Sequence, residues 1–155
     1  MGASSFTLED DVEQQAIDWL VEQGYQDMRA TSNGSRNEQI YLERGNDEHN
    51  VLLAGRLRVA FERLNPGYTV DDYTEAVRQM QRLVDSPDMM IDNHKMHKLL
   101  IEGVKISRSI KGENRTLTLR PIDFKNVDAN DFVVTNQVTV LQGDHNRRPD
   151  IVLYI

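Results

Sequence analysis

The spacing of apolar residues changes partway along this chain, and this change is the strongest constraint on its fold. Up to Gly103 the apolar residues recur with the 3.6-residue period of helices, and after Gly103 they alternate with the period of two that is typical of strands. Helices followed by a largely antiparallel sheet are the arrangement of an α/β fold with α+β character. We therefore expect residues 1–103 to be mainly helical and residues 104–155 to be mainly strands.

Four helices are predicted before Gly103. The first begins behind a Thr7 cap and ends at Gly24, and the third is capped by Thr69. The other two are expected within residues 51–64 and 93–103. Between the first two helices, the apolar run QIYLER (39–44) is expected to form a short strand between turns.

The second part of the chain predicts strands separated by polar turns. Residues 104–110 and 115–122 alternate around the turn KGEN and predict a β-hairpin. Residues 132–142 predict a third strand, in which Gln137 stands among valines as a candidate buried polar anchor.

The last predicted strand has a different pattern. Residues 151–155 (IVLYI) are apolar at every position, which is typical of a strand covered on both faces. We therefore expect a central strand whose next neighbour belongs to a longer chain. On this reasoning the chain is a fragment, and its sheet is incomplete at the C-terminus.

Length and composition set further limits. The chain has 155 residues, the size of one ordinary domain, and it contains no cysteine, which excludes a disulfide scaffold and thiolate metal sites. No window approaches the ~18 consecutive apolar residues of a membrane span, and we expect a cytoplasmic protein without membrane contact. A single domain is therefore expected over residues 1–155.

The net charge of −7 argues against simple electrostatic wrapping of nucleic acid. The charge is uneven, because residues 1–90 hold 8 Lys and Arg against 17 Asp and Glu, whereas residues 91–155 hold 10 against 8. A polyanion would therefore prefer the second half of the chain.

Asp150 is the strongest candidate for chemistry. It follows the basic turn that contains Arg147 and Arg148, is preceded by Pro149, and stands at the start of the last apolar strand. Rigid strand backbone would hold its carboxylate near the edge of the sheet, where it could serve in catalysis or bind a metal. A turn-capping aspartate is the alternative.

Five segments, in this order, resemble the N-terminal nuclease region of the restriction (R) subunit of type I restriction enzymes. One resembles the opening helix of that region and one resembles its helical insert, and together the five cover nearly the whole chain. The segments are residues 6–26, 64–83, 93–106, 119–140 and 147–155.

The resemblance implies a restriction-endonuclease-like core of the PD-(D/E)xK superfamily. In such a nuclease an aspartate on one strand meets a Glu-x-Lys on the neighbouring strand, since residues i and i+2 of a strand point to the same face. The carboxylates hold Mg²⁺ through oxygen ligands, and the lysine helps to position or activate the attacking water. The metal also neutralises charge that develops on the phosphodiester.

Carried over to this chain, Pro149-Asp150 matches the first half of that motif, while the Glu-x-Lys half would lie beyond Ile155. Such nucleases also use a glutamate on the first helix, which implies Glu13 as a second catalytic and metal-binding residue, with Glu9 as the alternative. Both could instead be exposed acids that suit a helix start. Arg147 and Arg148 could contact DNA phosphate or simply keep the entrance to the strand soluble.

The resemblance further implies a parent protein that cleaves double-stranded DNA. Cleavage would be coupled to translocation by an ATP-dependent motor region outside this chain, and the parent would work with modification and specificity subunits. Because the Glu-x-Lys half is missing, we expect the 155-residue chain to be inactive on its own. The alternative is a non-catalytic assembly or DNA-docking module in which Asp150 only caps a turn.

Overall fold

The computed structural model describes residues 8–31, 35–84 and 89–155, so the predicted cap at Thr7 lies outside the described residues. The backbone groups into two compact units. The first unit comprises residues 1–42, 46–49 and 131–155, and the second comprises residues 43–45 and 50–130. Each is described separately, and the expected single domain stays a prediction.

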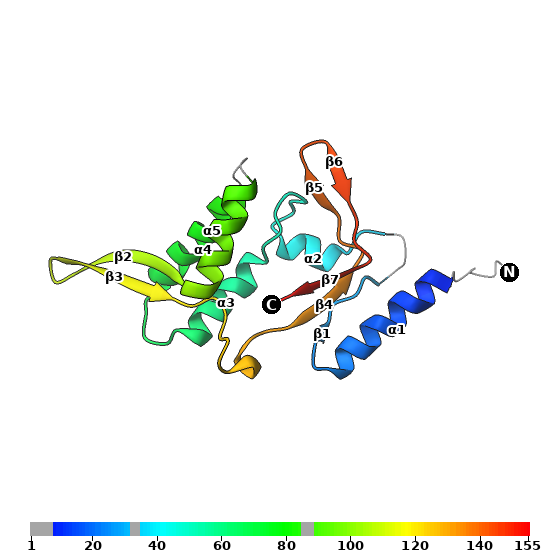
Figure 1. Cartoon of the computed structure of the whole chain (residues 1–155), viewed down its shortest axis with the longest axis horizontal. Helices are drawn as coiled ribbons and strands as arrows, with labels where there is room; N and C mark the ends of the chain where they lie inside the picture. The colour runs from blue at the N-terminus through cyan, green and yellow to red at the C-terminus, as the bar shows by residue number, and fades with distance from the viewer. Residues whose placement is uncertain (1–7, 32–34, 85–88) are drawn as a thin grey trace. The chain divides into compact units, whose positions relative to one another are not determined.

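The first unit contains a small mixed sheet, two helices and a separate two-stranded hairpin (Figure 1). Its elements are α1 (Leu8–Glu22), β1 (Gln26–Asp27), α2 (Glu38–Glu43), β4 (Val133–Asn136), β5 (Val140–Gln142), β6 (His145–Arg147) and β7 (Ile151–Tyr154).

The sheet of the first unit has the strand order β1-β4-β7. β1 runs parallel to β4, with Gln26 opposite Val133, and β7 runs antiparallel to β4, with Ile151 opposite Asn136. The β5–β6 hairpin connects β4 to β7 and stands away from the sheet in Figure 1. The predicted α/β fold with a largely antiparallel sheet is confirmed, although β1 was not expected.

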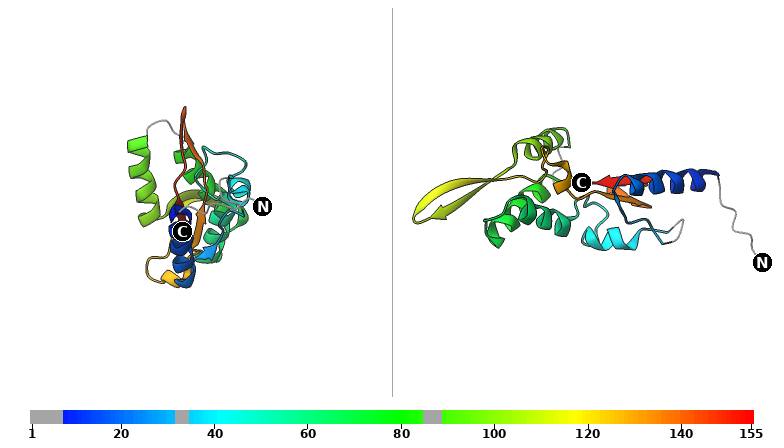
Figure 2. Two further views of the ribbon diagram at one scale, coloured as in Figure 1. Left: turned by 90° about the vertical axis from the view of Figure 1, so that its right-hand side faces the viewer. Right: turned by 90° about the horizontal axis from the view of Figure 1, so that it is seen from below.

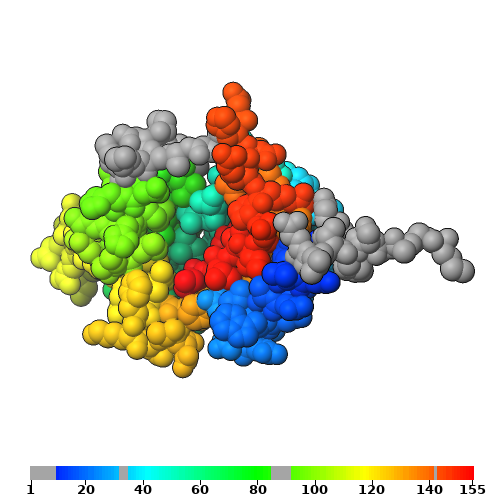
Figure 3. Space-filling view, turned by 45° about the vertical axis from the view of Figure 1, so that its right-hand side comes forward, coloured from blue at the N-terminus to red at the C-terminus, as the bar shows by residue number. Residues whose placement is uncertain are grey.

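The central strand of this sheet is β4, whose four residues are all buried. The last strand was expected to be covered on both faces, with its next neighbour in a longer chain. Among the described residues β7 pairs with β4 alone, so the further neighbour stays a prediction. The side chains of β7 remain partly open, and Leu153 is 45% exposed. Figure 3 shows this segment lying at the surface of the unit.

The second unit packs three helices against a β-hairpin and has its own apolar core. Its elements are α3 (Ala54–Leu64), α4 (Val70–Val84), α5 (Met89–Glu102), β2 (Val104–Ile110), β3 (Glu113–Leu119) and the short 3₁₀ helix η1 (Val127–Ala129). The buried core residues are Phe61, Tyr73, Ala76, Val77, Met80, Val104, Ile106 and Leu119. The right-hand view of Figure 2 shows the tip of the hairpin extending beyond these helices.

Gly103 makes the change from α5 to β2 possible. Its φ of +87° lies in the left-handed region, and a Cβ added there would come within 2.8 Å of the Thr118 side chain. The helix therefore ends where the period of the sequence changes. No helix among the described residues is long and apolar enough to cross a membrane.

Three sequence predictions are corrected in detail. Residues 39–44 were expected as a strand but belong largely to α2, because the Asn37 side chain accepts a hydrogen bond from the Ile40 backbone N–H (3.2 Å) and caps the helix. The strand expected over 132–142 is broken at Gln137, whose φ is +56°. The hairpin turn is shortened to Lys111 and Gly112, because both adopt positive φ as a two-residue type I′ turn requires.

The predicted cap at Thr69 is confirmed and extended by Asp72. The Thr69 hydroxyl accepts a hydrogen bond from the Asp72 backbone N–H (3.3 Å), and the Asp72 carboxylate accepts one from the Thr69 N–H (2.8 Å). Asp72 is 4% exposed and also forms an ion pair with Arg108 of β2. Burial raises the pKa of Asp72, but the hydrogen bonds from Thr69 and the charge of Arg108 outweigh it and lower the pKa below its ordinary value.

We predict that Asp72→Asn lowers the free energy of unfolding of the second unit by about 1–3 kcal/mol at neutral pH, since it removes a buried charged acceptor. Because the folded pKa of Asp72 is depressed, its contribution is fully present above the unfolded pKa of about 3.9 and is lost as the pH falls through the folded value. Urea unfolding at pH 7 and at low pH measures this.

The matched control is Asp71→Asn, at the exposed neighbouring position of α4. It should change stability by less than Asp72→Asn at every pH. An equal loss in both variants, or a loss for Asp72→Asn that persists at low pH, would contradict the assigned role of Asp72.

Candidate functional site

The half-buried Glu13 side chain is held by the sheet of the first unit. Glu13 lies on α1, and its Oε1 accepts a hydrogen bond of 2.6 Å from the Asn136 side-chain amide at the end of β4. The Asn136 Oδ1 in turn accepts a hydrogen bond of 2.7 Å from the Ala30 backbone N–H. A helix carboxylate predicted from the sequence is thus connected to the central strand.

The opposite face of β4 carries a second polar contact. Thr135 and Asn136 are consecutive, so their side chains point to opposite faces of the sheet. The Asn37 amide donates to Thr135 Oγ1 (2.8 Å) and to the Met28 carbonyl (2.7 Å), and Thr135 Oγ1 itself donates to the Met28 carbonyl (2.8 Å). These contacts attach the start of α2 to the sheet.

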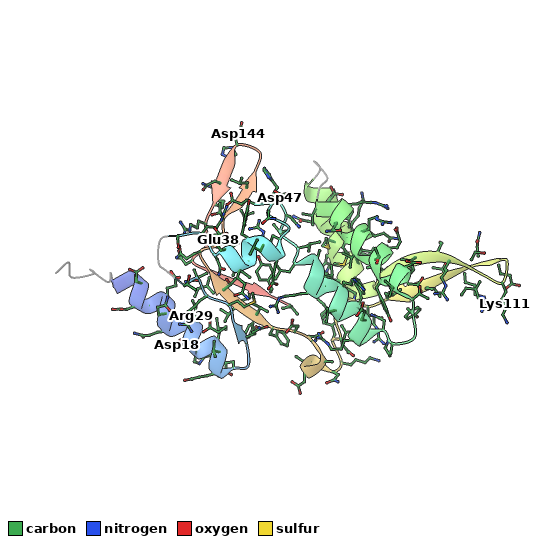
Figure 4. The ribbon with its side chains drawn as sticks, turned by 180° about the vertical axis from the view of Figure 1, so that it is seen from behind. Asp18, Arg29, Glu38, Asp47, Lys111 and Asp144 are labelled. Carbon is green, nitrogen blue, oxygen red and sulfur yellow. The ribbon has the colours of Figure 1, made fainter. Side chains whose placement is uncertain are left out.

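Arg29 fixes α1 against the segment that follows β1. Its guanidinium donates to Gln14 Oε1 (2.7 Å) and Asp18 Oδ1 (2.6 Å) on α1, and to both carboxylate oxygens of Asp27. Figure 4 shows Arg29 and Asp18 reaching toward each other. The hydrogen bond from Arg29 is the main cause that lowers the pKa of Asp27. Several contacts shared by one guanidinium hold the helix that carries Glu13 more firmly than one exposed ion pair would.

Asp150 is exposed and directly precedes β7. The next residue, Ile151, pairs with Asn136, and Asn136 holds Glu13 through its side-chain amide. The two predicted carboxylates therefore lie on elements that both adjoin the end of β4. The side chain of Glu9, the alternative helix carboxylate, lies outside the described part of the chain.

The two arginines of the basic turn differ in their surroundings. Arg147 is the last residue of β6, where it pairs with Val140, and its side chain is exposed. Arg148 is also exposed, but its guanidinium donates to the Ser35 carbonyl (2.8 Å), so the segment before β7 is attached to the segment before α2.

The carboxylates of the predicted site residues are chemically suited to a hard divalent cation. Carboxylate oxygens are the ligands that Mg²⁺ prefers, and among the described residues no hydrogen bond is found to the second oxygen of Glu13. Within residues 8–31, 35–84 and 89–155, no group of three or more His, Cys, Asp or Glu side chains gathers to hold a metal. Glu13 and Asp150 are the two predicted site residues that would hold such a cation.

Sequence reasoning missed Asn136 and Asn37. It named Gln137 as the buried polar anchor, whereas Asn136 is 0% exposed and Gln137 is only half-buried. The segment VVTNQV did indicate buried hydrogen bonds, because polar residues inside an apolar strand need partners. The prediction chose Gln137, one residue after the true anchor. No sequence signal pointed to Asn37, whose partners on β4 lie about 100 residues away along the chain.

The fold and site define an α/β protein in which a helix glutamate contacts the central strand of a mixed sheet and an aspartate precedes the strand beside it. Residues 6–155 match the family model described as the type I restriction enzyme R protein N terminus. The chain belongs to this family, which confirms the resemblance found in the sequence.

Two curated relatives support the assignment. The chain is 31% identical to a Methanocaldococcus jannaschii protein whose name assigns it to the MjaIXP type I restriction enzyme as an endonuclease subunit, over 93% of this chain and 14% of the relative. It is 28% identical to the type I restriction enzyme HindI endonuclease subunit of Haemophilus influenzae, over 70% of this chain and 10% of the relative. No solved structure gives a significant match.

We predict that Asn37→Ala lowers the free energy of unfolding of the first unit by about 2–4 kcal/mol, because it removes both a helix cap and buried hydrogen bonds. Chemical denaturation monitored by circular dichroism measures the loss. Asn146→Ala, at an exposed position of β6, is the control and should stay within about 0.5 kcal/mol of the wild type. Equal stability of the two variants would exclude Asn37 as an anchor of the sheet.

Proposed function

We propose that this chain is the nuclease part of the restriction subunit of a type I restriction enzyme. The parent protein cleaves double-stranded DNA by Mg²⁺-dependent phosphodiester hydrolysis, coupled to translocation by an ATP-dependent motor region outside these residues. It works in the cytoplasm with modification and specificity subunits. The observation that carries the proposal is the family match over residues 6–155, with Asp150 at the entrance to β7 beside the strand that holds Glu13.

The proposed chemistry is that of a PD-(D/E)xK nuclease. Asp150 and Glu13 would supply oxygen ligands for Mg²⁺, and the bound ion would stabilise the negative charge that develops on the phosphodiester. The Glu-x-Lys pair of such a site does not occur after Asp150 in these residues. The chain spans about a seventh and a tenth of the two relatives, so there is room for that pair in a longer protein.

Arg147 and Arg148 are proposed to contact DNA phosphates beside the cleavage site. Both side chains are exposed next to Asp150, and guanidinium groups suit phosphate oxygens. Arg147 is the stronger of the two candidates, because the Arg148 guanidinium already donates to the Ser35 carbonyl.

One observation favours a non-catalytic DNA-docking module as the second candidate. The β2–β3 hairpin and Arg120 after it carry Lys105, Arg108, Lys111, Arg115 and Arg120 against the single acid Glu113, in a chain whose net charge is −7. Arg108 is neutralised by Asp72, whereas Lys111 lies at the tip of the hairpin (Figure 4). Such a tip could dock on phosphates without any metal site.

In the complete restriction subunit assembled with its partner subunits, Asp150→Ala is expected to reduce DNA cleavage roughly 100-fold or more, because a metal ligand is lost. ATP hydrolysis should persist, since no motor residue is changed. Cleavage of a plasmid with a recognition site and phosphate release from ATP are measured together.

Asp144→Ala, at the tip of the β5–β6 hairpin, is the matched control and should cleave like the wild type (Figure 4). Full cleavage by Asp150→Ala would overturn the nuclease proposal. If DNA binding then fell with Lys111→Ala, the docking module would be the better reading.

The 155-residue chain alone is expected to leave supercoiled plasmid intact in the presence of Mg²⁺ or Mn²⁺, because it lacks the Glu-x-Lys pair. Gel electrophoresis of the plasmid detects nicking. Nicking by the pure chain that disappears in Asp150→Ala would show that these residues already form a complete site.

A further inference from the structure

The Asn136 side chain is completely buried, and both ends of its amide are hydrogen-bonded. Its relative exposure is 0%; the Oδ1 faces the Ala30 backbone N–H at 2.7 Å and the Nδ2 faces Glu13 Oε1 at 2.6 Å. A backbone N–H can only donate, so the amide oxygen must be the atom that faces Ala30. The NH₂ group is therefore forced to point at the Glu13 carboxylate.

This geometry places a neutral donor against a carboxylate. A donor without charge orients the carboxylate, yet it leaves the negative charge available to a cation. Asn136 donates only to Oε1 of Glu13, so the lone pairs of Oε2 are left available for a cation. An arginine or lysine in place of Asn136 would instead neutralise the charge that a metal needs.

Asn136 is itself held rigidly. Its backbone pairs with Ile151 of β7, next to Asp150, and its carbonyl accepts a hydrogen bond from the Asn37 amide (3.3 Å) on the other face of the sheet. The residue that orients Glu13 is thus fixed relative to the strand that begins after Asp150. Metal ligands in proteins commonly depend on such outer hydrogen-bond partners, whose loss weakens metal affinity about 10–100-fold.

We propose that Asn136 is a positioning residue, which orients the Glu13 carboxylate for a divalent cation at the proposed nuclease site. The inference rests on the proposed nuclease function. It adds a residue that touches neither the metal nor DNA and that acts through Glu13.

Asn136→Asp tests the proposal with almost no change in shape. The variant keeps an acceptor for the Ala30 N–H but replaces the donor to Glu13 by an oxygen, so two carboxylates face each other. In the complete restriction subunit, the Mg²⁺ concentration for half-maximal cleavage should rise about 10–100-fold. At saturating Mg²⁺ the maximal rate should recover to within a few-fold of the wild type.

A second readout needs no enzymatic activity. Paramagnetic Mn²⁺ added to the 155-residue chain should broaden the nuclear magnetic resonance signals of the Glu13 region, and Asn136→Asp should need about 10-fold more Mn²⁺ for the same broadening. Asp144→Ala, far along the sequence from Glu13 and at a hairpin tip, should match the wild type.

The double variant Glu13→Gln with Asn136→Asp separates positioning from a purely structural role. Donor and acceptor are exchanged, so the hydrogen bond and the stability lost in Asn136→Asp should return, whereas the Mg²⁺ and Mn²⁺ requirements should stay raised. If the metal requirement returned together with stability, or if Asn136→Asp left the Mn²⁺ requirement unchanged, the positioning role would be overturned. These results are distinct from failure of the nuclease proposal, which would appear as full cleavage by Asp150→Ala.

Discussion

The burial of two polar side chains at the end of β4 is the constraint on which the first unit depends. Thr135 and Asn136 are both 0% exposed and point to opposite faces of the sheet. A buried donor or acceptor without a partner costs about 1–3 kcal/mol, so both faces must supply matching groups. Asn37 supplies them on one face, and Glu13 with the Ala30 N–H supplies them on the other.

The need for these hydrogen-bond partners determines where α1 lies on the sheet, as well as how stable the unit is. Apolar contacts tolerate small sliding movements of a helix on a sheet, whereas a hydrogen bond of 2.6 Å between Asn136 and Glu13 fixes the register of α1. Arg29 reinforces the register through Gln14, which directly follows Glu13, and through Asp18, more than one helical turn further along. The first unit is thus built around a short central strand, and polar contacts fix the register of α1 that apolar packing alone would not fix.

The sequence predicted what depends on local patterns and missed what depends on tertiary contacts. The change from mainly helices to mainly strands after Gly103 and the cap at Thr69 follow from period and residue type, and the structure has both. The helix at residues 38–43 was missed because its cap comes from Asn37, whose orientation is set by strand β4 far along the chain. The left-handed backbone at Gln137 could not be read from the sequence either, because glutamine seldom adopts it.

The position of the last strand in the sheet also depends on tertiary contacts. An apolar run shows that a strand can be covered on both faces, but it does not say which strand of a sheet is central. In the first unit that position belongs to β4, which is interrupted by polar residues, because its Thr135 and Asn136 find partners on both sides. The same polar residues explain why the two candidate carboxylates differ in how firmly their side chains are oriented. Glu13 is oriented by a buried amide, whereas Asp150 is exposed where the chain enters β7, so under the nuclease proposal Glu13 is the preorganised ligand. The position of Asp150 then depends on the backbone of β7 and therefore on its pairing with β4.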